Sequence, residues 1–189
     1  KLNIEIDIEK RFLAGYVDVH FDALNPMKRM QIDLYENMKI NSITIKGNEL
    51  EYERIGNATF INFPKEIKGN HVVRVKYEGN PTTAKNAPWD GGFVWKTDDN
   101  GKPWVGVACE GAGASLWWPN KDHLSDEPDS MAINITIPEN LTCVANGTLR
   151  SKTSLTKGFN TWNWFVHYPI NNYNVTVNIA DYAHFQEWW

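Results

Sequence analysis

The sequence is short of the residues on which many active sites depend. Among its 189 residues are only 2 cysteines and 5 histidines, and it has no H-E-x-x-H, G-x-S-x-G or C-x-x-C motif. Acidic and basic residues number 23 and 19, so no basic surplus is available to neutralise the phosphates of a nucleic acid. No segment approaches the roughly 18 consecutive apolar residues of a membrane-spanning helix. These shortages predict no metal site, no nucleic-acid partner and no membrane span in this chain.

The cysteines and the chain ends carry limited information. Cys109 and Cys143 are too few for a disulfide framework and match no metal-binding spacing, so two buried free thiols are the simpler interpretation, with one disulfide left open. The chain begins at Lys1 inside an alternating pattern and stops at Trp188-Trp189 inside a segment that predicts a strand. These ends predict a piece of a longer protein, and they leave exported and cytoplasmic locations equally open.

Alternation of apolar and polar residues with a period of two dominates the chain. It predicts strands around residues 2–8, 17–21, 30–34, 43–45, 50–52, 59–61, 72–77, 104–109, 131–137, 162–166 and 173–179. Glycine and asparagine predict turns at 47–48, 56–57, 68–70, 98–101, 146–147 and 157–158. No window shows a helical apolar stripe. The sequence therefore predicts an all-β fold of about a dozen short strands in sandwich-like antiparallel and mixed sheets, organised as one domain over residues 1–189.

Glu110 is the one candidate binding residue that the pattern itself singles out. It follows the predicted strand at 104–109 and precedes the small residues Gly111, Ala112 and Gly113. Small residues let a ligand approach, and a partly desolvated carboxylate pairs well with an ammonium group. The alternative is that Glu110 accepts hydrogen bonds from the loop N–H groups and only shapes the turn. The residues alone favour that alternative, and a nearby acidic cluster at 122–129 is interpreted as a solvated loop with local turn bonds.

The order of motifs around Glu110 resembles a known family. Glu110 opens E-G-A-G-A-S-L-W-W-P-N-K-D, which with S-D-E-P at 125–128 resembles the N-terminal domain of the aminopeptidase N family of zinc metallopeptidases. Further matching stretches follow the family order at 7–15, 76–81, 89–95, 137–149 and 162–173. Ala108 and Asn120 depart from residues common in relatives, Gln and Cys respectively, which indicates a distinct subfamily.

The resemblance implies a fold, a partner and a role for Glu110. It implies a saddle-shaped all-β N-terminal domain that caps a downstream catalytic domain, absent from this sequence, which holds the zinc and removes N-terminal residues from peptides. It implies that Glu110, with Gly111 and Ala112, binds the free α-amino group of the peptide and borders the first side-chain pocket. No catalytic residue and no cofactor is implied within this chain, so the chain alone is expected to be inactive.

Two other interpretations remain at this point. The 9 tryptophans and 7 tyrosines are also compatible with a carbohydrate-binding β-sandwich, in which exposed rings would stack on sugars. Trp162 and Trp164 lie two residues apart and so share one face, which is either core or binding platform. A purely architectural domain is the third interpretation, and it predicts an exposed apolar patch around Trp117 and Trp118.

Overall fold

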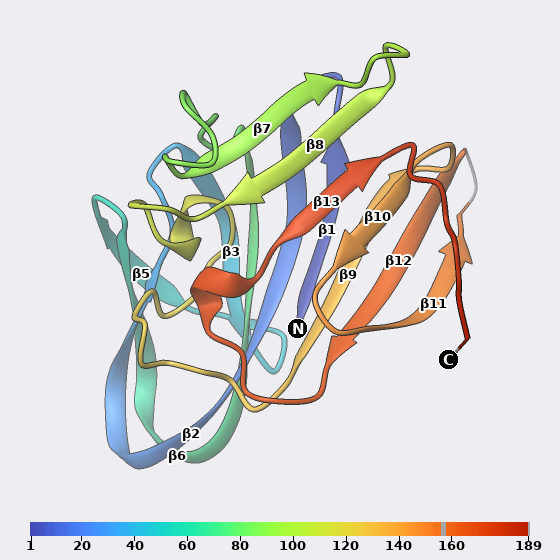
Figure 1. Cartoon of the computed structure of the whole chain (residues 1–189). Helices are drawn as coiled ribbons and strands as arrows, with labels where there is room; N and C mark the ends of the chain where they lie inside the picture. Colours follow the sequence, from blue (N-terminus) through green and yellow to red (C-terminus); the bar gives the residue numbers. More distant parts are fainter. Residues whose placement is uncertain (156–157, 189) are drawn as a thin grey trace.

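The structure is a computed structural model that describes residues 1–155 and 158–188. The described part is almost entirely β, with thirteen strands and two short 3₁₀ turns (Figure 1). The elements are β1 (Leu2–Asp7), β2 (Phe12–Asp33), β3 (Met38–Ile45), β4 (Asn48–Glu49), β5 (Glu51–Ile55), β6 (Ala58–Gly79), β7 (Gly92–Thr97), β8 (Pro103–Ala108), η1 (Ala114–Leu116), β9 (Met131–Pro138), β10 (Thr142–Ala145), β11 (Thr148–Ser154), β12 (Phe159–Val166), η2 (Asn172–Asn174) and β13 (Val177–Ala180). The predicted all-β class is confirmed.

Two sheets make up the fold. Nine strands form a mixed sheet in the order β11-β12-β9-β1-β2-β6-β3-β4, with β5 paired to β6. Its one parallel pair is β1 with β9; every other pairing in it is antiparallel. The second sheet is antiparallel, in the order β10-β13-β8-β7, and faces the viewer in Figure 1. The prediction of both antiparallel and mixed sheets is therefore confirmed.

The core lies between the two sheets and follows the alternation seen in the sequence. Leu2, Ile4 and Ile6 of β1 are buried, and they sit next to Ile133 and Ile135 of β9, which are also buried. Alternate residues of the small sheet complete the core from the other side: Phe93, Val105, Cys143, Val177 and Ile179 are all fully buried. Burial of these side chains is the main source of stability, since apolar area removed from water contributes about 25 cal/mol per Å².

The two longest strands correct the predicted strand lengths. β2 and β6 each run for 22 residues and pair over most of that length, whereas the sequence predicted shorter strands broken by a turn at 68–70. Gly69 has a φ of +84°, the conformation expected of a turn, but it lies within β6 opposite Ala23, where the β2–β6 register begins to shift. One type of bulge places a glycine at positive φ, as many tight turns do, so Gly69 marks an irregularity in the β2–β6 pairing rather than the end of a strand.

Other predicted elements differ in detail. The turns at 56–57 and 98–101 connect β5 to β6 and β7 to β8, as predicted. The strands predicted at 43–45 and 50–52 do not pair with each other: β3 pairs with the two-residue β4, and Tyr52 pairs with β6. The strand expected over 173–179 begins only at Val177, after η2, and residues 181–188 form no strand. The predicted turn at 157–158 and the end of the predicted strand at Trp189 fall on residues outside the described ones.

Most of the tryptophans pack in or against the hydrophobic core. Trp117, Trp118 and Trp162 are buried, and Trp95 and Trp164 pack against the same core. The indole of Trp117 makes edge contacts with Phe93 and with Trp118, at ring-centroid distances of 6.0 and 6.3 Å. The predicted exposed patch around Trp117 and Trp118 is therefore wrong: both rings are buried, and Trp117 packs against Phe93 of the small sheet. This distribution favours core packing over a row of sugar-stacking rings.

Cys109 and Cys143 are both buried and free, as the simpler interpretation predicted. Burial raises the pKa of the Cys109 thiol to about 11 and also raises that of Cys143. Because the thiolate is the reactive form, both side chains are unreactive near neutral pH and act as core residues.

Candidate substrate-binding loop

Glu110 lies where the sequence predicted, two residues beyond the end of β8. Its side chain is exposed, and the backbone turns sharply behind it, with the N–H groups of Ala112 and Gly113 both donating to the carbonyl of Cys109 at 3.0 and 2.9 Å. The turn is therefore closed by backbone hydrogen bonds rather than by the Glu110 carboxylate. The alternative role for Glu110, shaping its own loop, receives no support from these contacts.

Asp122 forms hydrogen bonds to the C-terminal end of this loop, at Ala114 and Ser115. Its carboxylate accepts hydrogen bonds from the N–H groups of Ala114 and Ser115, at 3.2 and 3.0 Å, and from the Ser115 hydroxyl at 2.5 Å. It thereby satisfies backbone donors at the start of η1, which have no partner within so short a helix. The sequence placed Asp122 in an acidic loop cluster with local bonds, and its role in fixing the end of the Glu110 loop was missed.

Gly111 and Gly113 offer a matched test of this loop, since both have positive φ, +65° and +82°. A Cβ added at Gly111 meets nothing within 4 Å, whereas at Gly113 it would lie 2.3 Å from an Asp122 carboxylate oxygen. We expect Gly111→Ala to lower the free energy of unfolding by about 1 kcal/mol, from backbone strain alone. Gly113→Ala should cost about 1–3 kcal/mol more, because the Asp122 cap must move. Urea unfolding of the two variants measures the difference, and equal losses would show that Asp122 does not hold the loop in solution.

The loop between β2 and β3 forms hydrogen bonds to Ala112 and to the start of η1. The Tyr35 hydroxyl donates to the Ala112 carbonyl at 2.9 Å, and the Tyr35 N–H donates to the Ser115 carbonyl at 2.9 Å. The Arg54 guanidinium in turn donates to the carbonyls of Leu34, Tyr35 and Met38 at 2.6–2.7 Å. Charge-assisted hydrogen bonds of this kind are among the stronger ones in proteins, so the support under Ala112 is rigid.

The loop before β7 packs closely against Glu110 and Ala112. A Cβ on Gly91 would lie 2.6 Å from the Ala112 Cβ and 2.7 Å from the Glu110 carbonyl oxygen, so only glycine permits this approach. Asp90 fixes this neighbouring loop by accepting hydrogen bonds from the N–H groups of Lys85 and Asn86 at 2.6 and 2.7 Å. The stretch at 89–95, which resembles the family, therefore contacts the Glu110 loop directly.

Tyr173 is the hydrogen-bond partner of Glu110, a contact that the sequence pattern did not predict. Its hydroxyl donates a hydrogen bond to the Glu110 Oε2, although the residues are 63 positions apart. The bond raises the pKa of the Tyr173 phenol, because ionising it would place a second negative charge beside the carboxylate. The site therefore presents an exposed carboxylate, an adjacent phenol and a backbone turn of small residues, an arrangement suited to a small cation such as an ammonium group.

Within residues 1–155 and 158–188, no group of three His, Cys, Asp or Glu side chains is placed to hold a metal ion. The same described residues include no helix long and apolar enough to cross a membrane. The residues of the Glu110 loop can bind a cation by charge and hydrogen bonds, but they supply no metal-ligand set.

Solved structures with a similar fold include M1 zinc metallopeptidases and an LTA4 hydrolase. The chain superimposes on a two-domain M1 zinc metallopeptidase bound to L-tryptophan with a TM-score of 0.77 and 18% identity, over 94% of this chain and 40% of that one. An M1 zinc metallopeptidase of Deinococcus radiodurans bound to a Tyr-Ser-Ala substrate gives 0.74 and 19% identity, over 89% and 38%. Yeast LTA4 hydrolase in complex with bestatin gives 0.72 and 17%, over 95% and 27%.

The fold is that of the N-terminal domain of M1 zinc metallopeptidases. The resemblance predicted from the order of motifs is thus confirmed at the level of the fold. The chain spans 27–40% of the length of these three proteins. No family model and no curated protein matches the sequence.

Proposed function

We propose that this chain is the N-terminal domain of a zinc aminopeptidase and that Glu110 binds the free amino group of the peptide substrate. The observation that carries the proposal is the fold match over nearly the whole chain, combined with an exposed carboxylate on a braced loop at the end of β8. The Tyr-Ser-Ala, L-tryptophan and bestatin complexes of the similar structures make a small molecule with a free amino group the natural ligand to test.

In the proposed enzyme the role of this chain is orientation. The Glu110 carboxylate pairs with the substrate ammonium and thereby fixes which peptide bond reaches the catalytic domain, an effect on positioning rather than on bond breaking. Gly111 and Ala112 border the pocket because they leave room beside the carboxylate. Zinc, held by the catalytic domain outside this chain, would supply the activated water for hydrolysis.

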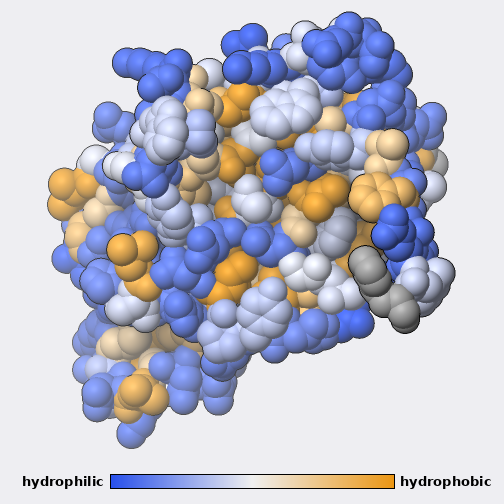
Figure 2. All heavy atoms as spheres, viewed as in Figure 1, coloured by the Kyte–Doolittle hydropathy of each residue, from blue (hydrophilic) through white to orange (hydrophobic). Residues whose placement is uncertain are grey.

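The outer face of the four-stranded sheet is the surface we assign to contact with the catalytic domain. Val94, Trp104 and Val144 are at least partly exposed there, and Pro88, Val94 and Trp104 line a pocket of about 330 Å³. Figure 2, viewed from this side, shows apolar side chains exposed among polar ones across the face. Exposed apolar surface of this kind is typical of an interface between domains.

A chain that only orients the substrate should not hydrolyse it. We expect residues 1–189 alone to release no product from an aminoacyl reporter amide above the uncatalysed rate, with or without added zinc, because the described residues supply no metal-ligand set. A fluorogenic assay at high protein concentration measures this. Hydrolysis by the purified chain that a chelator abolishes would contradict the proposal.

A further inference from the structure

We propose that Tyr173 is a positioning residue that holds the Glu110 carboxylate in the orientation that receives the substrate ammonium. The inference rests on the proposed function of Glu110 and adds a second residue to that site. It is carried by the hydrogen bond between the two side chains and by the way in which the Tyr173 turn is anchored.

The contact joins an exposed carboxylate to a side chain that is anchored in the core. Glu110 is exposed, whereas the ring of Tyr173 is half-buried and packs against the hydrophobic core. The Tyr173 hydroxyl donates to Oε2 of Glu110. One carboxylate oxygen is thus occupied by a fixed donor, while Oε1 has no protein partner among the described residues. A free carboxylate rotates among several rotamers, so a donor on one oxygen reduces the entropy lost when a cation binds to the other.

The turn that carries Tyr173 is anchored on one side to the segment after the Glu110 loop. Asn171 caps η2 by accepting a hydrogen bond from the Tyr173 N–H at 2.9 Å, and its amide donates to the Leu124 carbonyl. The buried Asn172 donates to the Lys121 carbonyl at 2.7 Å. These side-chain amides fix η2 against the segment that also contains Asp122.

The other side of η2 is tied to β8 itself. The Thr176 hydroxyl donates to the Val107 carbonyl at 3.0 Å, three residues before Glu110, and the Thr176 N–H donates to the Asn146 side chain at 2.8 Å. In Figure 1 the turn of η2 lies beside the end of β8. Because Tyr173 and Glu110 project from segments bonded to each other, their relative position is set by the backbone and the hydroxyl meets the carboxylate without a further rearrangement.

The protonation state of the Tyr173 phenol is consistent with its role as a hydrogen-bond donor to Glu110. The pKa of Tyr173 is raised by its bond to Glu110, so the phenol remains a donor throughout the neutral range. An ammonium group that binds Glu110 meets a neutral hydroxyl beside the carboxylate, and the site keeps its negative charge for the cation.

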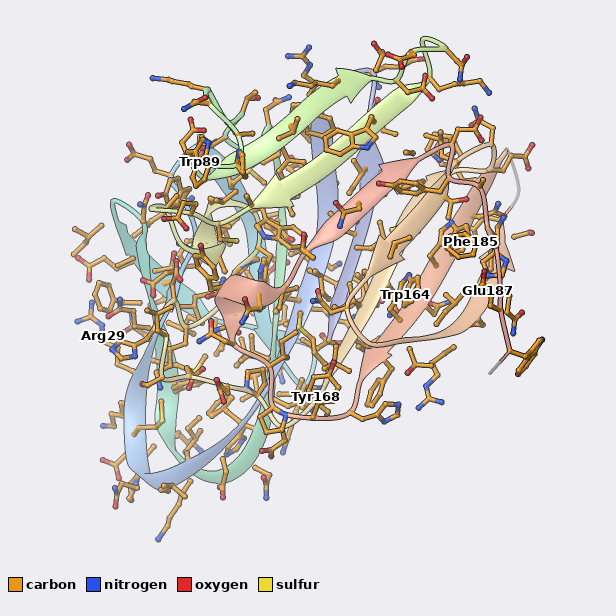
Figure 3. All side chains as sticks on the ribbon, in the orientation of Figure 1. Arg29, Trp89, Trp164, Tyr168, Phe185 and Glu187 are labelled. Atoms are coloured by element: carbon orange, nitrogen blue, oxygen red, sulfur yellow. The ribbon has the colours of Figure 1, made fainter. Side chains whose placement is uncertain are left out.

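Kinetics of the full-length enzyme tests the inference. Tyr173→Phe removes only the hydroxyl, and we expect it to raise KM for a free-amino peptide about 3- to 10-fold, the loss expected when one restrained side chain becomes mobile. The value of kcat should stay within about twofold, because the hydroxyl contacts no reacting bond. In a Glu110→Ala background the same substitution should have no further effect on KM, since the group it positions is gone. Tyr168→Phe is the control, because Tyr168 is 60% exposed on the connection after β12, away from the end of β8 (Figure 3).

The outcomes distinguish the proposed role of Glu110 from the proposed role of Tyr173. If Glu110→Ala leaves KM unchanged, both the proposed function of Glu110 and this inference are wrong. If Glu110→Ala raises KM but Tyr173→Phe does not, the inference alone is overturned. Carbon NMR of the Tyr173 ring in this chain gives a readout independent of activity: Glu110→Gln should lower the Tyr173 pKa towards its ordinary value, and an unchanged titration would show that the bond is absent in solution.

Discussion

Glu110→Ala is expected to raise KM for a peptide with a free amino group about 10- to 100-fold in the full-length enzyme, the range expected for losing a hydrogen-bonded charge pair. The carboxylate lies exposed at the end of β8 and takes no part in closing its own turn, so its removal should leave the loop intact. The loss should appear in KM, because the amino group is bound in the ground state as well as in the transition state. Steady-state kinetics with an aminoacyl reporter and a tripeptide measures it.

Two variants make this prediction specific. Glu110→Gln keeps the shape and the hydrogen-bonding oxygen but removes the charge, so it should fall between wild type and Glu110→Ala. Glu49→Ala removes another exposed carboxylate, in β4 of the large sheet, and should leave KM unchanged. An unchanged KM in Glu110→Ala would reduce Glu110 to an ordinary loop residue and remove the functional assignment made for this chain.

Trp117→Ala is expected to lower the free energy of unfolding by about 4 kcal/mol, the usual cost of deleting a large buried aromatic side chain. Trp117 is fully buried and contacts Phe93 of β7 and Trp118. Removing the indole would leave a cavity between the site loop and the small sheet, which the surrounding strands cannot close. Urea unfolding followed by far-ultraviolet circular dichroism measures the loss without relying on tryptophan fluorescence.

Trp89→Ala is the matched control for this prediction. Trp89 belongs to the neighbouring loop but is 78% exposed, so its removal should change the free energy of unfolding by less than about 0.5 kcal/mol. Figure 3 places Trp89 on the loop before β7, at the edge of the small sheet. Similar losses for the two variants would mean that Trp117 is not enclosed in solution and that the predicted exposed patch exists after all.

The alternation of residues predicted the sheet faces well because the period of a strand has a direct geometric cause. Leu2, Ile4 and Ile6 all point into the core, and their polar neighbours Asn3 and Glu5 do not. Strand length was predicted less well. Gly69 looks the same in the sequence whether it makes a turn or a bulge, and only pairing with β2 over the whole length of β6 distinguishes them.

The site was predictable in part. The position of Glu110 at a strand end and the small residues after it are local features, and the structure places both as predicted. The contacts that brace it are not local: Tyr173 reaches Glu110 across 63 residues, and Tyr35 reaches Ala112 across 77. The burial of Trp117 and Trp118 was missed for a similar reason, because a loop without periodicity does not indicate which of its side chains point inward.

The natural reading frame beyond Trp189 is the measurement that tests whether this chain is one part of a zinc aminopeptidase. We expect an H-E-x-x-H motif downstream, followed by a further glutamate ligand, since these residues supply the zinc site that the described residues do not. A natural protein that continues without such a motif, or that ends near residue 189, would contradict the proposed function and favour a binding module instead.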